Sequence, residues 1–255
     1  MAEPARKPGF ASPTEDDEEP GITVLRWVER PDGGMEHVEL PLTPELFLNP
    51  QIGDKMTQGR RHVETMAEVA MLLRDHFRSD PEVLVLSDVK HLLGPGFPEP
   101  GPDVSVIRGI RNKEADRESF DVRKEGALPF LVIEIVSPLD SRIRRIDLRD
   151  KVEIYARAGI REYLILDSTR QDRRFRLLGY RLGQAGRYLP IELDAEGRIL
   201  SELGLWFQIS PDGQRLYIFE SPSGQRLLNL EEEREAADVE IARLKAELER
   251  LRGGT

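Results

Sequence analysis

The spacing of apolar and polar positions along the chain predicts alternating strands and helices. Runs rich in Val, Ile and Leu predict strands over residues 22–28, 83–86, 104–107, 130–136 and 163–167. Apolar residues at intervals of three and four predict a long helix over 59–77. A short helix is expected after Thr43, an N-cap residue that Pro44 follows. A further helix over 146–158 should end at Gly159, which suits a left-handed C-cap.

The segment from 130 to 167 has the order strand, helix, strand, which predicts a crossover connection and at least one parallel strand pair. From 175 to 220 the pattern changes to short strands separated by turn residues such as Asp212-Gly213. These patterns together predict an α/β fold with a mixed central sheet, flanking helices and a β-rich C-terminal extension.

The two ends of the chain differ from this core. Residues 1–20 lack periodicity and are rich in Pro, Glu and Asp, which predicts a disordered acidic tail. The folded domain is expected over 21–225, and a heptad helix over 226–255. In that helix, apolar residues recur at alternating spacings of four and three, with one arginine in the series: Leu230, Arg234, Ala237, Ile241, Leu244, Leu248 and Leu251.

A helix this short is marginal when isolated in water, so it needs a partner. A second copy of the chain is the simplest one, which predicts a homodimer through the C-terminal helix. The alternative is a helix that frays or packs on its own domain.

Composition and charge narrow the class of protein. The chain has 255 residues, no cysteine and a net charge of −10, and no apolar run approaches the length of a membrane span. No signal peptide is visible, so we expect a soluble cytoplasmic protein. The acidic balance is uneven, because residues 141–176 hold eleven Arg or Lys against six acids. That cluster is either a solvated surface or a patch that faces phosphate groups.

Several common motifs are absent. The sequence has no Gly-x-x-x-x-Gly-Lys-Ser/Thr loop, and Gly94-x-Gly96 is followed by prolines and does not open a helix. It has no Gly-x-Ser-x-Gly elbow. The four histidines lie far apart without the spacing of zinc ligands. The sequence thus argues against a P-loop ATPase, a dinucleotide-binding enzyme, a serine hydrolase of that type and a zinc site.

Two acids stand in or next to segments that are otherwise apolar. Asp103 lies in Pro102-Asp103-Val104, and Glu134 interrupts the run 130–136. A buried carboxylate is costly unless a cation compensates it, and two converging carboxylates suit Mg²⁺. The alternatives are a strand-entry turn for Asp103 and a buried pair with an arginine for Glu134.

A lysine on the following helix adds to this pattern. Asp147, Lys151 and Tyr155 are four residues apart and form one helical stripe. The stripe is either a surface Asp–Lys pair or a means of aiming Lys151 at a metal-bound phosphate. His62, near the start of the first long helix, is either a solvent-facing or capping residue or a supporting residue of the same site.

These motifs together resemble the Uma-two family of restriction endonucleases, a branch of the PD-(D/E)XK nuclease-like superfamily. The resemblance covers most of 41–229. It is carried by Leu42-Thr43-Pro44-Glu45, Pro102-Asp103-Val104 and the run 132–138, and by the extension 197–205. The most specific part runs from Asp147 through Lys151 and Tyr155 to Tyr163.

The resemblance implies a restriction-endonuclease-like core with Asp103 and Glu134 as metal ligands and Lys151 as the catalytic lysine. The superfamily usually carries its lysine two residues after the acid, where this chain has Val136. The family is thought to recruit the lysine from the following helix, which agrees with Lys151.

From these observations we expect a metal-dependent endonuclease acting on DNA. Mg²⁺, with Mn²⁺ as a substitute, would be bound by Asp103, Glu134 and the backbone carbonyl of Ile135, and Asp147, Tyr155 and His62 would support the site. The expected contacts to the DNA backbone are Arg142, Arg144, Arg145 and Arg149. The alternatives are a non-catalytic nucleic-acid or protein-interaction module on the same fold, and an enzyme for a small phosphoester.

Overall fold

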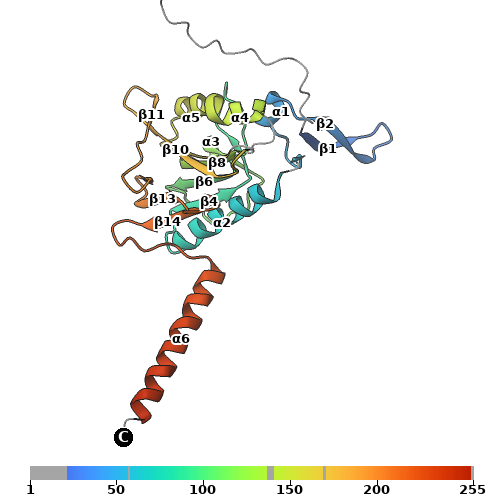
Figure 1. Cartoon of the computed structure of the whole chain (residues 1–255). Coiled ribbons are helices and arrows are strands. Elements are labelled where there is room, and N and C mark those ends of the chain that lie inside the picture. The colour runs from blue at the N-terminus through green and yellow to red at the C-terminus, as the bar shows by residue number, and fades with distance from the viewer. Residues whose placement is uncertain (1–21, 57, 137–140, 169–170, 254–255) are drawn as a thin grey trace, which may run out of the picture.

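A six-stranded mixed sheet forms the centre of the molecule in this computed structural model, which describes residues 22–56, 58–136, 141–168 and 171–253 (Figure 1). The expected disordered tail, 1–20, lies outside the described residues. The strand order is β11-β10-β9-β8-β6-β4. These strands are β4 (Val83–Ser87), β6 (Val104–Arg108), β8 (Pro129–Val136), β9 (Glu162–Ser168), β10 (Phe175–Leu182) and β11 (Tyr188–Pro190).

The pairing of β8 with β9 is parallel, and the other pairs of this sheet are antiparallel. Between β8 and β9 the chain forms α4 (Ser141–Arg145), η1 (Ile146–Asp150) and α5 (Lys151–Ala158). The crossover expected from the sequence is therefore confirmed. The helical segment begins earlier than the sequence predicts, at Ser141, and its middle part, η1, is a π-helical turn.

Both faces of the sheet are covered, so β8 and β9 are almost entirely buried. Helix α2 (Arg60–His76) and a second sheet, β12-β13-β14, pack on one face. Helix α5 packs on the other face. The second sheet consists of β12 (Arg198–Leu200), β13 (Leu205–Ile209) and β14 (Leu216–Glu220). Since this sheet buries Ile199, Phe207 and Ile218 in the same apolar cluster as Val69 and Leu73, the β-rich extension belongs to the main core.

Smaller elements surround the end of the sheet that carries Asp103. A three-stranded sheet of order β2-β1-β3 contains β1 (Thr23–Glu29), β2 (Met35–Pro41) and β3 (Lys55–Met56). Helix α1 (Pro44–Leu48) follows β2, and Thr43 caps it as expected. The remaining elements are β5 (Lys90–Leu92), β7 (Ser119–Asp121) and α3 (Val122–Glu125). The sequence did not predict β2, because its many polar residues give no strand pattern and its pairing with β1 supplies the structure.

Helix α6 (Leu230–Gly253) extends away from the body of the molecule (Figure 1). Its side chains from Glu233 to Arg252 are all exposed, so beyond its first turn α6 does not pack on its own domain. Among the described residues, no helix combines the length and apolar character that a membrane span requires.

Candidate active site

The strand register brings the two acids together. Strands β6 and β8 are antiparallel, with Val104 opposite Ile133 and Ser105 opposite Val132. One step further along this register, Asp103 lies opposite Glu134. Directly opposed residues point to the same face of a sheet, and their Cβ atoms are about 5 Å apart. The prediction that Asp103 and Glu134 converge is therefore supported by the register.

Asp103 is held by two hydrogen bonds at the start of β6. Its Oδ2 atom accepts from the backbone N–H of Ile135 at 2.6 Å, and its Oδ1 atom lies 3.0 Å from Nε2 of His62. His62 stands in the first turn of α2, so this bond joins the helix to the start of β6. The carboxylate is fixed in orientation by groups from two different elements.

Glu134 lies in the middle of the buried strand β8 and is 3 % exposed. Its Oε1 atom accepts from the hydroxyl of Tyr155 at 2.9 Å and lies 2.9 Å from Nζ of Lys151. Both groups come from α5, which packs on this face of the sheet. The helical stripe thus faces the sheet, and the surface-pair interpretation of Asp147 and Lys151 is wrong.

Lys151 is 1 % exposed and lies between two acids. Its Nζ atom is 2.8 Å from Oδ1 of Asp147 as well as 2.9 Å from Glu134, and 4.4 Å from the centre of the Phe47 ring. The π-helical turn η1 carries Asp147, and Lys151 follows directly after it. The Tyr163 hydroxyl donates to the backbone carbonyl of Asp147 at 2.9 Å and anchors this irregular turn to β9. Such turns are frequent at functional sites.

The charges in this cluster fall into pairs with one acid in excess. Burial opposes ionisation of Asp103, but the neighbouring His62 holds the pKa of Asp103 below its usual value. Burial likewise opposes protonation of His62, yet Asp103 raises the His62 pKa. Burial would lower the pKa of Lys151, but the negative charges of Asp147 and Glu134 raise it above its usual value. Burial raises the pKa of Asp147, an effect that Lys151 opposes. Asp103 and His62, and Asp147 and Lys151, therefore form two acid–base pairs.

Glu134 is the remaining acid. Burial raises its pKa to about 8, an effect that Lys151 only partly offsets. A group in this state binds a proton at neutral pH unless another cation takes its place. This excess acid is the observation that makes a cation plausible here on chemical grounds, since carboxylate oxygens are the ligands that Mg²⁺ prefers.

The donor set fits a hard divalent cation that keeps water ligands. Within the described part of the chain, no three His, Cys, Asp or Glu side chains form a ready metal-binding group. Asp103, Glu134 and the carbonyl of Ile135 would therefore supply only part of a coordination shell, as is usual for Mg²⁺. Lys151 and Tyr155 both contact Oε1 of Glu134, so Oε2 is the oxygen that these two bonds leave for a ligand.

A cavity of about 50 Å³ adjoins these side chains. A site of this volume holds a few water molecules, which is too little for an enclosed metabolite. Its lining includes Asp103, Glu134, Asp147 and Lys151, together with His62. The substrate group that reaches this site must therefore be small, such as one phosphate of a larger molecule.

Two of the lining residues that were not candidates from the sequence lie where they can affect the charged groups. Asp88 is exposed beside the cavity, in the turn between β4 and β5, and has a left-handed backbone with φ of 54°. Phe47, from α1, covers the ammonium group of Lys151. A left-handed backbone is uncommon for a residue other than glycine, which draws attention to Asp88. The sequence carries no signal for Asp88 or Phe47, because only the fold places them next to the site.

The expected DNA contacts are not equivalent. Arg144 forms a bidentate pair with Asp167, with bonds of 2.9 and 2.7 Å, and this engages its guanidinium in the fold. Arg142, Arg145 and Arg149 are exposed on the same helical segment. Arg144 therefore has a structural partner that the sequence did not indicate.

Comparison with known proteins identifies a family for this chain. The model of the Uma2 family, described as "Putative restriction endonuclease", matches residues 43–212. A search of curated proteins found no match. Among solved structures, a "putative nuclease belonging to DUF820" from Anabaena variabilis is similar at 19% identity, with a TM-score of 0.40. The similarity covers 55% of this chain and 72% of that one. The family match spans most of the folded domain, from α1 to the end of β13, and on that ground the chain belongs to the Uma2 family and has its restriction-endonuclease-like fold.

Proposed function

We propose that this protein is a metal-dependent endonuclease that hydrolyses phosphodiester bonds in DNA. The observation that carries the proposal is the buried cluster in which Asp103 and Glu134 lie opposite each other with the ammonium group of Lys151 beside them. The family match supports a nuclease at a coarser level. The metal, the DNA substrate and the roles of individual residues are our inference.

Asp103, Glu134 and the Ile135 carbonyl would hold Mg²⁺ or Mn²⁺. Such a cation supplies charge neutralisation at the phosphate and lowers the pKa of water. His62 and the Ile135 N–H keep Asp103 in one orientation. The Tyr155 hydroxyl does the same for Glu134. This preorganisation matters because catalytic groups must be held within fractions of an ångström of the productive geometry.

Lys151 is the positive side chain closest to Glu134 and is held in place by Asp147. We propose that its ammonium group stabilises the negative charge that develops on the phosphate during attack by water. Asp147 is then a positioning residue, because it contacts Lys151 and acts through it. The exposed arginines Arg142, Arg145 and Arg149 would contact the DNA backbone, which predicts binding that weakens steeply with salt.

The size of the cavity favours a polymer over a small phosphoester. The site takes one phosphate-sized group, and the rest of the substrate must lie on the surface of the protein. A continuous strand meets this condition. We also propose that the working form is a homodimer assembled through α6.

The test is a cleavage assay with Mg²⁺ or Mn²⁺ on supercoiled plasmid, duplex DNA, single-stranded DNA and RNA. Asp103→Asn, Glu134→Gln and Lys151→Met should each lower the cleavage rate by at least about 100-fold. The exposed residues Glu114 and Lys124 provide matched controls, as Glu114→Gln and Lys124→Met, which should keep the wild-type rate.

Calorimetric titration with Mn²⁺ provides a readout that does not depend on turnover. Wild-type protein should bind Mn²⁺, and Glu134→Gln should weaken binding strongly. Wild-type cleavage by Lys151→Met would remove this residue from the mechanism. DNA binding without cleavage, unchanged in all three site variants, would instead support the non-catalytic module.

A further inference from the structure

Helix α6 presents an apolar stripe that nothing in the described part of the chain covers. Five large side chains of this stripe are about half exposed or more: Leu230 (67%), Ile241 (48%), Leu244 (47%), Leu248 (52%) and Leu251 (65%). They belong to the seam, by which we mean the seven positions 230, 234, 237, 241, 244, 248 and 251. The alternating spacing of four and three is that of a two-stranded coiled coil.

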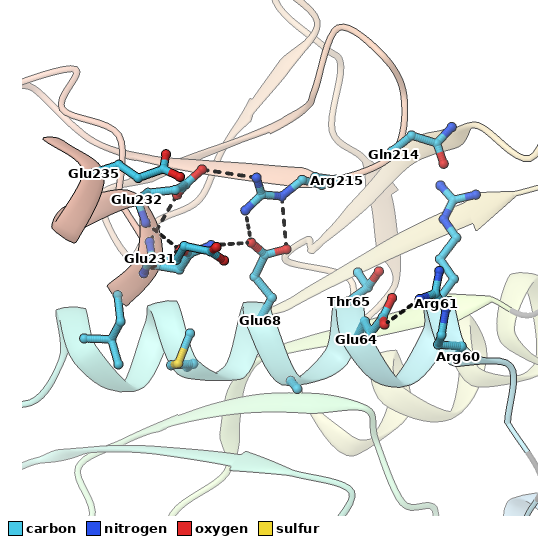
Figure 2. A pocket seen from close by; sticks show the side chains of 14 residues that line it. Arg60, Arg61, Glu64, Thr65, Glu68, Gln214, Arg215, Glu231, Glu232 and Glu235 are labelled. Carbon is cyan, nitrogen blue, oxygen red and sulfur yellow. Dashed lines mark hydrogen bonds and ion pairs between the residues drawn. The ribbon is translucent and has the colours of Figure 1, made fainter. Parts of the chain in front are cut away.

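The first turn of α6 is fastened to the nuclease domain by a network of ion pairs, shown in Figure 2. Arg215, at the start of β14, bonds to Glu68 of α2 and lies 3.1 Å from Glu232 of α6. Arg226 reaches the same Glu232 oxygen at 3.0 Å. Asn229 accepts from the backbone N–H groups of the first turn of α6 and also bonds to Glu68 at 3.1 Å.

We call the group of Glu68, Arg215, Arg226, Asn229 and Glu232 the latch. It borders an open groove of about 980 Å³ between α2 and the base of α6, which Figure 2 shows. Because the latch fixes the first turn by several bonds to α2 and to residues on both sides of β14, the direction in which α6 leaves the domain is defined. Whatever binds the seam is therefore held in a defined orientation relative to the domain.

The order of residues along the seam indicates which way a second copy lies. The four large residues Ile241, Leu244, Leu248 and Leu251 occupy the last half, whereas Arg234 and Ala237 occupy the first half. In a parallel, in-register pair, each large side chain meets its own copy. In a full-length antiparallel pair, Leu251 would face Arg234 and Leu248 would face Ala237. Burial of apolar surface therefore favours the parallel pair.

The residues beside the seam are compatible with the same arrangement. Glu233, Glu240 and Glu247 form one flank, and Glu231, Asp238, Lys245 and Arg252 form the other. In a parallel pair the first flank meets the second flank of the other helix, which sets Glu240 against Lys245 and Glu247 against Arg252, and Glu233 against Asp238. In an antiparallel pair each flank meets itself, so that Glu240 faces Glu247 while Glu231 faces Arg252 and Asp238 faces Lys245. The flanking charges are thus compatible with both directions, and the burial of apolar side chains in the seam decides for the parallel pair.

The weak layer of the seam is compensated in the parallel pair. There the two Arg234 side chains meet, and Glu233 and Asp238 flank them on both helices. A single polar layer of this kind costs stability but fixes the register. The arginine in the series thus acts as a register mark.

From this self-complementarity we propose that α6 forms a parallel, in-register two-stranded coiled coil with a second copy of the chain. The latch then holds both nuclease domains at the same end of the coil. The consequence for cleavage, that one dimer presents two active sites to one duplex and cuts both strands, rests on the proposed function.

The chain contains no cysteine, so single cysteine variants report the geometry without background. Leu251→Cys should form a disulfide-linked dimer under mild oxidation, because the two copies of this residue meet in a parallel coil at a distance that a disulfide spans. An equimolar mixture of Leu251→Cys and Arg234→Cys tests the antiparallel pair. Cross-linking confined to the mixed product would overturn the parallel arrangement.

Light scattering after size-exclusion chromatography gives the mass without a cross-link. Wild-type protein should be a dimer at about 10 μM, and Leu244→Glu with Leu248→Glu should be a monomer with at least a 10-fold weaker association. Ala242→Glu, on the outer face of α6, is the matched control and should stay dimeric. A wild-type monomer at about 100 μM would refute the proposal.

The activity readout separates this inference from the proposed function. The dimer should convert supercoiled plasmid to linear DNA, and the Leu244→Glu, Leu248→Glu monomer should produce nicked circles. If wild-type protein is dimeric but cleaves nothing, the nuclease assignment fails and the coiled coil stands. Linear product from the monomer at the wild-type rate would refute the functional consequence of the dimer.

Discussion

The ion pairs of Lys151 offer a sharp test of how the site is balanced. Lys151→Met keeps most of the side-chain volume but removes the ammonium group that lies 2.8 Å from Asp147 and 2.9 Å from Glu134. Removing one partner of a buried pair leaves a buried charge without compensation, at a typical cost of about 3–5 kcal/mol. The structure allows a separate calculation of this cost.

In the variant, the buried acids avoid the cost of a bare charge by binding protons. Glu134 already has a pKa of about 8, so it is mostly protonated at neutral pH. Asp147 must bind a proton as well, against its ordinary value of 3.8. At ~1.36 kcal/mol per pH unit, protonation of one Asp at pH 7 costs about 4 kcal/mol, and at pH 5 less than about 2 kcal/mol.

The sign of the pH dependence follows from this calculation. The pKa of Asp147 in the folded variant lies above the unfolded value, so the folded state binds the extra proton and loses stability as the pH rises. The destabilisation of Lys151→Met relative to wild type should therefore grow by about 1.4 kcal/mol per pH unit between pH 5 and pH 7.

The assay is urea unfolding followed by circular dichroism in the presence of EDTA, at pH 5, 6 and 7. Lys124→Met is the control, because Lys124 is exposed and its pair with Asp121 spans 3.6 Å. This control should change the free energy of unfolding by less than about 0.5 kcal/mol at each pH. A cost for Lys151→Met that is the same at all three pH values, or below about 1 kcal/mol at pH 7, would refute the charge balance described here.

Three further predictions concern other parts of the fold. Burial lowers the pKa of His91 from 6.5 to about 4. The free energy of unfolding of the wild type should therefore fall by about 3 kcal/mol as the pH drops from 6.5 to about 4. His91→Gln should lose none of this, and the two urea midpoints should approach each other from pH 7 to pH 4.5; parallel midpoints would contradict the assignment. Arg144→Gln should cost about 1–3 kcal/mol, because it leaves Asp167 buried without its partner. Arg145→Gln should leave stability unchanged and should reduce by about one the slope of the logarithm of the DNA-binding constant against the logarithm of the salt concentration. If Arg145→Gln lost stability and Arg144→Gln did not, the structural role would belong to Arg145. Gly159→Ala should cost about 1 kcal/mol in thermal unfolding, because φ is 85° at this C-cap.

The sequence was most informative about elements whose pattern is local. The apolar run 130–136, the three-and-four spacing of 59–77 and the C-cap at Gly159 each report one segment, and the structure has strand β8, helix α2 and the end of α5 at those places. The parallel pair β8–β9 also followed from the sequence, because a strand-helix-strand unit of this length has few ways to connect.

Part of the candidate site could also be predicted from local patterns in the sequence. Asp103 and Glu134 were noticeable because an acid in an apolar strand needs compensation, and Lys151 because it shares a helical stripe with Asp147. The sequence could not distinguish a surface stripe from a buried one. The packing of α5 against β8 decided this, since it left Lys151 1 % exposed.

The chain alone thus determined most of the helices and strands of the core, which acids were conspicuous in them, and where α6 carries an apolar seam. Tertiary structure decided the rest. The register of β6 against β8 set Asp103 opposite Glu134, the start of α2 brought His62 to Asp103, and Asp167 engaged Arg144. The physical reason is that spacing along a segment fixes only the face on which a side chain lies. Which group meets it there depends on contacts between segments tens of residues apart, and these form only when the core packs.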